Sequence, residues 1–293
     1  MKVKIIVDSS SGLTEAQANQ LGWGFIPLQC QLDGKNYLIG KEIFIKDFAE
    51  MWNKNRKMDA ATSASSPAIN EQVVSQYLEE YDKILIYSIS KHLSSQNSFL
   101  ITQFQDNEKV FIVDSKKLSF LILKDLLTFE EEIKNGIPFE EAIKIFDENN
   151  KKLILIPQFN DALVKGGRLS KAAAVVAKLL KIVPLIAFDN GKLEKEGIGR
   201  VFTKSLEKTV SEMWSQNKDN IKNKYLFVAH AENQMIDKLI ESFRSIINDE
   251  IEIYSIDLPV DISVHTGIGA VCVSIVDIDE KIKDKFLHYC KKW

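Results

Sequence analysis

Cysteine and histidine, which build most metal sites and disulfide frameworks, are scarce in this sequence. Its 293 residues include only three cysteines, Cys30, Cys272 and Cys290. They lack the spacing of metal ligands, and an odd number leaves at least one outside any disulfide. His92, His230 and His288 have no partners at the spacing of metal ligands. Because 45% of the residues are hydrophobic, the chain can build full cores without a metal or a disulfide. We therefore expect no metal site, and we expect Cys30 and Cys272 to be small core residues.

Long apolar runs are also missing. The longest largely apolar stretch, 172–188, is interrupted by Lys178, Lys181 and Pro184, and it is too short to span a bilayer. The N-terminus begins directly with the strand-like VKIIV and shows no signal peptide. These features predict a cytoplasmic protein.

No excess of positive charge is present. The net charge is −3 with both signs interspersed, which argues against nucleic acid as a main partner. The basic end HYCKKW, residues 288–293, is typical of a solvated helix end, and it leaves a transient contact with a membrane surface open.

The common catalytic and nucleotide-binding motifs are absent as well. There is no G-x-S-x-G elbow, no G-x-x-x-x-G-K-[ST] loop and no G-x-G-x-x-G after a strand, so we expect no cofactor. A lipid-directed hydrolase or acyltransferase, with a serine nucleophile and His265 as base, stays an alternative without support from elbow spacing.

The first half of the chain alternates strands with helices. Apolar runs predict strands at 3–7, 83–89, 109–114 and 152–157. A hairpin is expected over 24–40 with its turn at Asp33-Gly34, and a polar loop over 62–70. Helices are predicted over 14–21, 45–54, 67–81, 118–135 and 139–149, with another between the strands at 83–89 and 109–114. This order predicts an α/β domain with a mostly parallel sheet covered on both faces.

The second half has a different order. We expect a helix over 170–181 and a hairpin that turns at 189–192. We then expect helices at 201–216 and 232–248, strands at 225–230, 251–257 and 270–276, and a short charged helix. This order predicts an α+β domain with an antiparallel sheet. With a boundary near 158–167, we expect domains at 1–160 and 161–293.

Polar residues gather where ligands of such sheets bind. The predicted parallel strands end in Asp8-Ser9-Ser10-Ser11, Ser88-Ile89-Ser90 and Asp114-Ser115, which predicts a polar rim at one sheet edge. Ser94 and Ser95 are expected in the first turn of a helix, where free N–H groups attract carboxylate or phosphate.

Two further segments hold candidate ligand-binding groups. The loop ATSASSP supplies the hydroxyl of Thr62, while Ser66 is expected only to cap a helix. The segment SVHTGIGA places His265 and Thr266 before two glycines, which let the backbone turn sharply or approach a ligand.

Arginine is rare beside 34 lysines, and one of the four arginines lies between a glycine pair and an apolar segment, in VKGGRLSKAAAVV. The planar fork of an arginine can bind phosphate with two parallel hydrogen bonds, which a lysine cannot reproduce.

Six of these motifs in order resemble the DegV family of bacterial fatty acid-binding proteins, the acyl-binding partners of fatty acid kinase. The motifs are IIVDSSSGL, TSASSP, SISKHLSSQNS, VDS, KGGRLSKAAA and HTGIGA, and they extend over nearly the whole chain. The resemblance implies a long-chain fatty acid in a tunnel between the two domains, with the apolar segment 172–188 as part of the lining.

The same resemblance implies roles for individual residues. Thr62 and Ser94 would hold the carboxylate, with Ser95, His265 and Thr266 beside it. Arg168 would contact the catalytic subunit of the kinase or the transferred phosphate. The protein would then not be an enzyme by itself, since the ATP site would lie on the kinase. An acyl carrier or lipid sensor with another protein partner stays open.

The sequence departs from the family motifs at five positions. Ala64 and Ser65 replace Gln and Pro, Ser95 and Gln96 replace Gly and Thr, and Ile268 replaces Pro. The loss of the motif glycine at position 95 would matter if its φ is positive, because serine tolerates that conformation poorly, so these departures predict a reshaped carboxylate site. Thr62 and Ser94 remain, and their assignment is kept.

Overall fold

The N-terminal half is built on a parallel sheet, as predicted. The computed structural model describes residues 1–148, 152–170, 175 and 182–293. The sheet has the strand order β2-β1-β6-β7, and every pair is parallel. Its strands are β1 (Val3–Asp8), β2 (Gly24–Ile26), β6 (Lys83–Tyr87) and β7 (Val110–Ile112).

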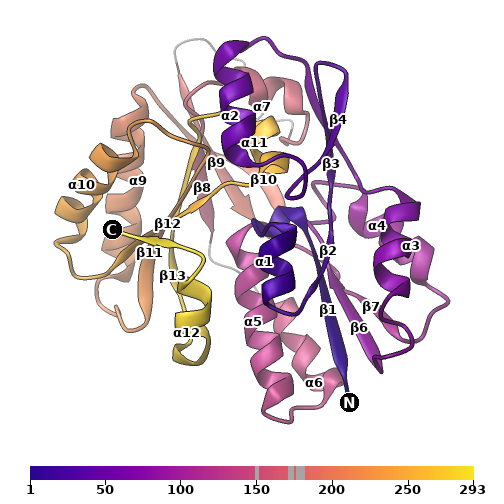
Figure 1. Ribbon diagram of the computed structural model, residues 1–293. Helices are drawn as coiled ribbons and strands as arrows, with labels where there is room; N and C mark the ends of the chain where they lie inside the picture. The colour runs from indigo at the N-terminus through magenta and orange to yellow at the C-terminus, as the bar shows by residue number, and fades with distance from the viewer. Residues whose placement is uncertain (149–151, 171–174, 176–181) are drawn as a thin grey trace.

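Helices cover both faces of this sheet (Figure 1). Apolar side chains of α3 and α4 pack on one face, and those of α5 pack on the other. Thr14 and Gln17 form the predicted capping box of α1, and Ser66 caps α3 through the N–H of Ile69. The helices are α1 (Glu15–Gln20), α3 (Pro67–Ser75), α4 (Gln96–Phe104), α5 (Phe120–Lys134) and α6 (Phe139–Ala142), with 3-10 turns at Ser9–Ser11 and Ile143–Asp147.

A small antiparallel sheet with the order β4-β3-β5 lies beside the parallel one. Asp33 and Gly34 both have positive φ, 46° and 82°, which confirms the predicted hairpin turn between β3 (Gln29–Leu32) and β4 (Lys35–Leu38). The expected loop at 62–70 is partly wrong, because residues 60–63 pair with β3 as strand β5 (Ala60–Ser63). Helix α2 (Ile45–Lys54) follows the hairpin.

The C-terminal half is built on a seven-stranded sheet with the order β10-β9-β8-β13-β11-β12-β14. The pairs are antiparallel as expected, except that β11 and β12 run parallel. The strands are β8 (Leu153–Ile156), β9 (Val183–Asp189), β10 (Lys192–Gly199), β11 (Lys224–His230), β12 (Ile253–Asp257), β13 (Val271–Asp277) and β14 (Lys291–Lys292).

Two expectations about this sheet are wrong, one of them in part. Strand β8 was expected in the first sheet, but it pairs with β9 and β13 of the second, so sheet membership changes before Leu153 rather than near 160. The basic C-terminal end is a helix end only at its start, because His288 is the C-cap of α12 while Lys291 and Lys292 pair with β12 as strand β14. A short apolar sequence can form a strand of either sheet, and only its pairing with other strands determines which sheet it joins.

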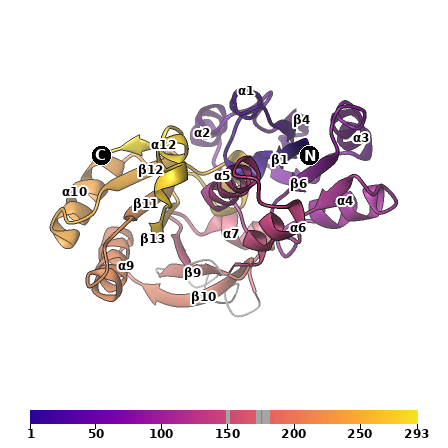
Figure 2. The same ribbon diagram turned by 90° about the horizontal axis from the view of Figure 1, so that it is seen from below.

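Helices of the second half lie on both sides of the sheet (Figure 2). Helices α9 and α10 bury their apolar faces together against one side. The helix expected over 170–181 lies outside the described residues apart from 170 and 175. The helices are α7 (Asp161–Gly166), α9 (Phe202–Asn217), α10 (Ile236–Ile247), α11 (Val260–Thr266) and α12 (Glu280–Leu287).

One hydrophobic core joins the two halves. Phe120 of α5 stacks on Phe227 of β11 with ring centroids 5.2 Å apart. Cys30 and Cys272 are buried, as predicted. Within the described ranges, no helix is long and apolar enough to cross a membrane, and no group of three or more potential ligands could hold a metal ion.

Candidate ligand-binding site

A cavity of about 610 Å³ lies between the two halves, and all six residues singled out from the sequence line it. Its volume falls within the range of small-molecule sites, roughly 300–1,000 Å³. The predicted residues in its wall are Thr62, Ser94, Ser95, Arg168, His265 and Thr266. Most other wall residues are apolar: Leu28, Ile89, Leu93, Phe99, Leu118, Leu153, Leu155, Phe188, Leu193, Leu258, Ile262 and Cys272.

Thr62 and His265 form the centre of the polar part of the wall. Thr62 is on β5, held by its pairing with β3, and His265 is near the end of α11, which packs against β5. The hydroxyl oxygen of Thr62 lies 2.6 Å from Nε2 of His265. When Nε2 carries the ring proton it donates to this oxygen, and the hydroxyl hydrogen of Thr62 is then free for a ligand oxygen.

The imidazole of His265 is neutral at neutral pH. Burial, and to a smaller extent the positive charge of Arg168, lower the pKa of His265 to about 4. Its Nδ1 is buried and has no partner among the described residues. His265 therefore offers hydrogen bonding without adding a second positive charge beside Arg168.

The glycine pair before Arg168 makes room for His265. A Cβ atom on Gly166 would lie 2.9 Å from Nδ1 of His265, so the backbone of the KGGR segment packs directly on the imidazole. Gly167 has a φ of 66°, the left-handed region that glycine adopts without strain. Arg168 folds back and donates from Nη1 to the carbonyl of Gly166 at 2.6 Å.

Ser94 and Ser95 come just before α4 rather than inside its first turn, which corrects the expectation. Ser95 is the N-cap residue, but its side chain makes no capping bond. The hydroxyl of Ser94 accepts from the N–H of Gln96 at 3.2 Å and still has a donor to offer. Both residues line the cavity beside the start of the helix.

Two departures from the family motifs are coupled to each other. The side-chain oxygen of Gln96, a fully buried residue, accepts from the backbone N–H of Ser65 at 2.9 Å. Its amide nitrogen donates to Asn70 at 3.4 Å. Proline at position 65 would have no N–H to donate. Gln96 and Ser65 therefore join the segment that carries Thr62 to the segment that carries Ser94.

Sequence reasoning missed Asp261, which also lines the cavity. It is 4% exposed, and neither carboxyl oxygen has a hydrogen-bond partner among the described residues. Burial, and then the nearby Asp8, raise the pKa of Asp261 to about 8, so this acid is protonated at neutral pH. It precedes His265 by four residues, a helical spacing that would have indicated a shared face had α11 been predicted.

The predicted polar rim is mostly satisfied by its own members. Asp8 accepts from the N–H and hydroxyl of Ser10 and from the N–H of Ile89, which ties the ends of β1 and β6. Burial raises the pKa of Asp8 to about 6 despite these bonds. The strand ends therefore support the site, while Thr62, Ser94 and His265 face the cavity.

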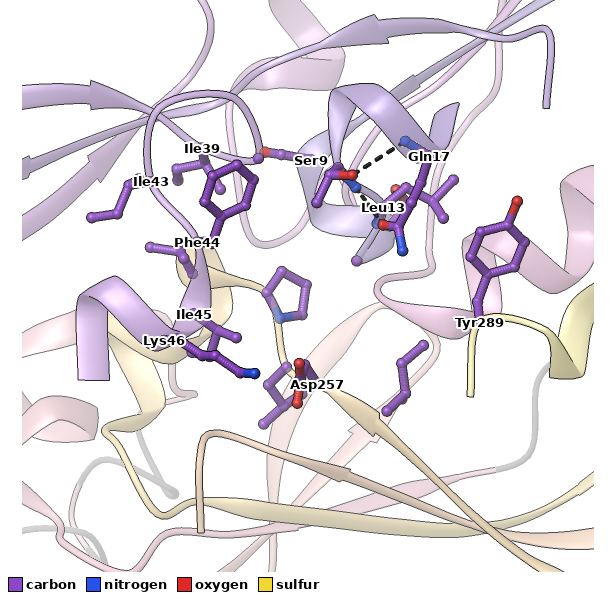
Figure 3. Close-up of a pocket in the computed structure, with 18 of the residues that line it drawn as sticks. Ser9, Leu13, Gln17, Ile39, Ile43, Phe44, Ile45, Lys46, Asp257 and Tyr289 are labelled. Atoms are coloured by element: carbon purple, nitrogen blue, oxygen red, sulfur yellow. Dashed lines mark hydrogen bonds between the residues drawn. The ribbon is translucent and has the colours of Figure 1, made fainter. Parts of the chain in front are cut away.

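A second cavity, of about 440 Å³, is lined in part by the connection between β12 and α11 (Figure 3). Ser9, Lys46, Asp257 and Tyr289 are among its polar wall residues, and Leu258 lines both cavities. Burial raises the pKa of Asp257, while Lys46 opposes this shift. None of the six predicted residues lines this cavity, so it does not belong to the same polar site.

Comparisons with known proteins agree with the fold. The family model described as "Uncharacterised protein, DegV family" matches residues 2–277. A DegV domain-containing protein of Mycoplasmopsis pulmonis is 40% identical over 291 residues, 99% of this chain and 100% of the relative. A fatty acid-binding protein of Thermotoga maritima is 28% identical, over 96% of this chain and 100% of that protein. The structure of a stearic acid-binding protein from Eubacterium ventriosum has a TM-score of 0.81 at 19% identity, covers 94% of this chain and 98% of its own, and shows the same fold.

Proposed function

Because the chain belongs to the DegV family, we propose that it binds a long-chain fatty acid in the cavity of about 610 Å³ between its two halves. The observation that carries the proposal is the composition of the wall. The wall holds several hydroxyls and an imidazole, with Thr62 and His265 in contact, and apolar side chains form most of the rest. A fatty acid has the same division between its carboxylate and its chain.

The energetics of this wall suit such a ligand. Each buried methylene contributes roughly 0.8 kcal/mol, so a long acyl chain provides on the order of 10 kcal/mol before ordering costs. The carboxylate needs hydrogen bonds, because burying it without partners is very unfavourable. Thr62, Ser94 and His265 are its proposed partners, and Ser95 and Thr266 lie beside them.

The fatty acid is proposed to be presented to a kinase catalytic subunit for acyl-phosphate formation, so that this chain binds a substrate rather than turning it over. Arg168 supports this role, because it is an exposed cation at the cavity wall with no ion pair among the described residues. The alternative of a serine nucleophile paired with His265 gains no support, since Nε2 contacts Thr62.

Mass spectrometry of the purified protein tests the proposal. We expect native and denatured spectra to differ by the mass of a long-chain fatty acid. Thr62→Ala and Ser94→Ala should each weaken binding by about 1–3 kcal/mol, while Thr62→Ser keeps the hydroxyl and binds nearly as the parent does. Thr102→Ala, on the exposed side of α4, is the matched control. A protein that is always empty and takes up no added fatty acid would refute the proposal.

A further inference from the structure

The cavity of about 440 Å³ in Figure 3 falls within the size range of small-molecule sites, and the proposed function gives it no role. Both halves of the chain form its wall. The N-terminal half contributes the turn before α1, the loop before α2 and the first residues of α2. The C-terminal half contributes the connection from β12 to α11. A ligand in this cavity would touch both halves outside the proposed fatty acid cavity.

Two side chains of opposite charge meet in the wall of this cavity. Lys46 is in the first turn of α2, and Asp257 is the last residue of β12. Figure 3 shows the ammonium group of Lys46 pointing toward Asp257, and its charge opposes the rise in the pKa of Asp257 that burial causes. Neither side chain forms an ion pair or a hydrogen bond within the described part of the chain. Both residues are exposed, so a ligand can reach them.

Most other polar groups of the wall already bond within the protein. Thr14 and Gln17 each accept from the backbone N–H of the other in the capping box of α1, and Asp47 accepts from the N–H of Phe44. The hydroxyl of Tyr289 has no hydrogen-bond partner among the described residues. The two opposite charges and this hydroxyl are therefore left to recognise a ligand.

The remainder of the wall is largely apolar. Its aliphatic side chains include Leu13, Ile39, Ile43, Leu123, Ile256 and Val260. A ligand that consists of charged groups alone would leave this surface in contact with water, whereas every methylene that a ligand buries there adds to its affinity. The cavity therefore favours a ligand that carries both charges close together and an apolar body beside them.

We propose that this cavity binds a small zwitterion with an apolar body, the chemical class of the hydrophobic α-amino acids. Asp257 accepts hydrogen bonds from the ammonium group, Lys46 donates to the carboxylate, and the apolar body lies on the aliphatic wall. A ligand with a single charge would leave the residue of like charge next to it without a partner, so the pair selects against amines and simple acids. This inference does not depend on the proposed binding of a fatty acid.

Leucine and analogues that lack one of its features test the site. L-leucine, L-phenylalanine, isoamylamine, isocaproic acid and glycine are titrated into the full chain by calorimetry at neutral pH. Isoamylamine is leucine without the carboxylate, isocaproic acid is leucine without the ammonium group, and glycine has no apolar body. We expect both hydrophobic amino acids to bind, and each of the other three ligands to bind at least about tenfold more weakly than L-leucine.

Two variants that each remove one charge assign the roles. Asp257→Asn should lower the affinity for L-leucine about tenfold and lose the preference for L-leucine over isocaproic acid. Lys46→Gln should lower it by a similar factor and lose the preference for L-leucine over isoamylamine. Lys54→Gln removes an exposed lysine of the same helix outside the cavity and should bind L-leucine as the parent does. Circular dichroism checks that each variant is folded.

The outcomes separate this site from the proposed fatty acid cavity. A parent protein that binds neither hydrophobic amino acid would overturn the inference, as would isoamylamine or isocaproic acid binding as tightly as L-leucine. Binding of L-leucine that saturating hexadecanoic acid abolishes, and that Asp257→Asn leaves unchanged, would assign the ligand to the larger cavity and overturn the site. A parent that binds L-leucine but takes up no fatty acid would refute the proposed function and support this inference.

Discussion

Asp261 is a buried carboxylic acid beside a second carboxyl group, and its ionisation opposes folding. Its pKa is raised from 3.8 to about 8 by burial and by Asp8. The folded state keeps a proton that the unfolded chain releases at lower pH. The stability associated with this group is therefore complete below about pH 4 and is lost as the pH rises toward 8, by about 1.4 kcal/mol per pH unit.

Replacing Asp261 with asparagine should remove this dependence. We expect the free energy of unfolding of Asp261→Asn to fall less steeply between about pH 5 and pH 8 than that of the parent, and the variant to be the more stable protein at about pH 8. Urea unfolding at several pH values measures the slopes. Asp59→Asn changes an exposed carboxylate and should keep the parent slope. Parallel slopes for all three proteins would contradict the raised pKa.

The role proposed for Arg168 is phosphate handling rather than fatty acid binding. Arg168 is an exposed cation at the wall of the fatty acid cavity, and the carboxylate already has neutral donors in the proposed site. We expect Arg168→Ala to bind fatty acid within about threefold of the parent but to fail in kinase-dependent acyl-phosphate formation, with Arg168→Lys restoring only part. Both quantities are measured on the same variants. Full acyl-phosphate formation by the alanine variant would show that Arg168 is an ordinary solvated side chain without a role in phosphate handling.

The functional role of a single residue could be predicted from the sequence where the residue belongs to a recognisable motif. Thr62, Ser94 and His265 were found by their neighbours, and the structure brings them to one cavity. Asp261 and Gln96 were missed as parts of the site because their importance depends on burial. Neither the unpaired carboxyl of Asp261 nor the contact of Gln96 with Ser65 leaves a pattern in a single sequence.

At the scale of elements, the turn between α7 and Arg168 fixes the place of His265. The two glycines of this turn serve different purposes. Gly166 leaves space, since a Cβ atom there would lie 2.9 Å from Nδ1 of His265, and Gly167 supplies a positive φ with nothing within 4 Å of its added Cβ.

The glycine pair therefore offers a matched test. Gly166→Ala should displace the imidazole from Thr62 and weaken fatty acid binding by about 1–2 kcal/mol, the worth of a lost hydrogen bond. Gly167→Ala should cost about 1–2 kcal/mol of stability through its backbone and leave binding nearly unchanged. Binding titrations and urea unfolding on both variants separate the effects. Equal losses of fatty acid affinity in the two variants would show that the two glycines do not have separate roles.

Features with clear local signals were predicted well, and elements that depend on pairing with distant strands were not. The Asp33-Gly34 turn, the capping box of Thr14 and the bounds of α2 follow from local chemistry and are confirmed. Strands β5 and β14 exist only through pairing with β3 and β12, so their sequences resemble loops or helix ends. Helix α11 has no side-chain cap, which hid the element that carries His265.

At the scale of the molecule, the two sheets form separate frameworks, but their side chains share one core. Phe120 stacks on Phe227 across the boundary, and α5 also packs against α12. The cavity takes its wall from both halves. A ligand there touches both frameworks, so its binding free energy should stabilise them together rather than one at a time.

The four tryptophans report on this coupling because they are divided evenly between the halves. Trp23 and Trp52 are in the N-terminal half, and Trp214 and Trp293 are in the C-terminal half. Replacing either pair with phenylalanine leaves fluorescence from one half only. We expect the fluorescence of each double variant to report a single unfolding transition that coincides with the loss of its circular dichroism. The midpoints of the two variants are compared after correction for the stability that each substitution pair itself removes.

Added fatty acid should then shift both reporters equally. A ligand that binds only the folded state adds RT ln(1 + [L]/Kd), about 2.7 kcal/mol at a hundredfold excess over Kd. If the halves unfolded independently, the ligand would stabilise only the half that makes most of the contacts with it. The two unfolding midpoints would then separate as ligand is added. Because Thr62 and Ser94 come from one half and His265 from the other, a carboxylate held by all three cannot remain bound when either half unfolds.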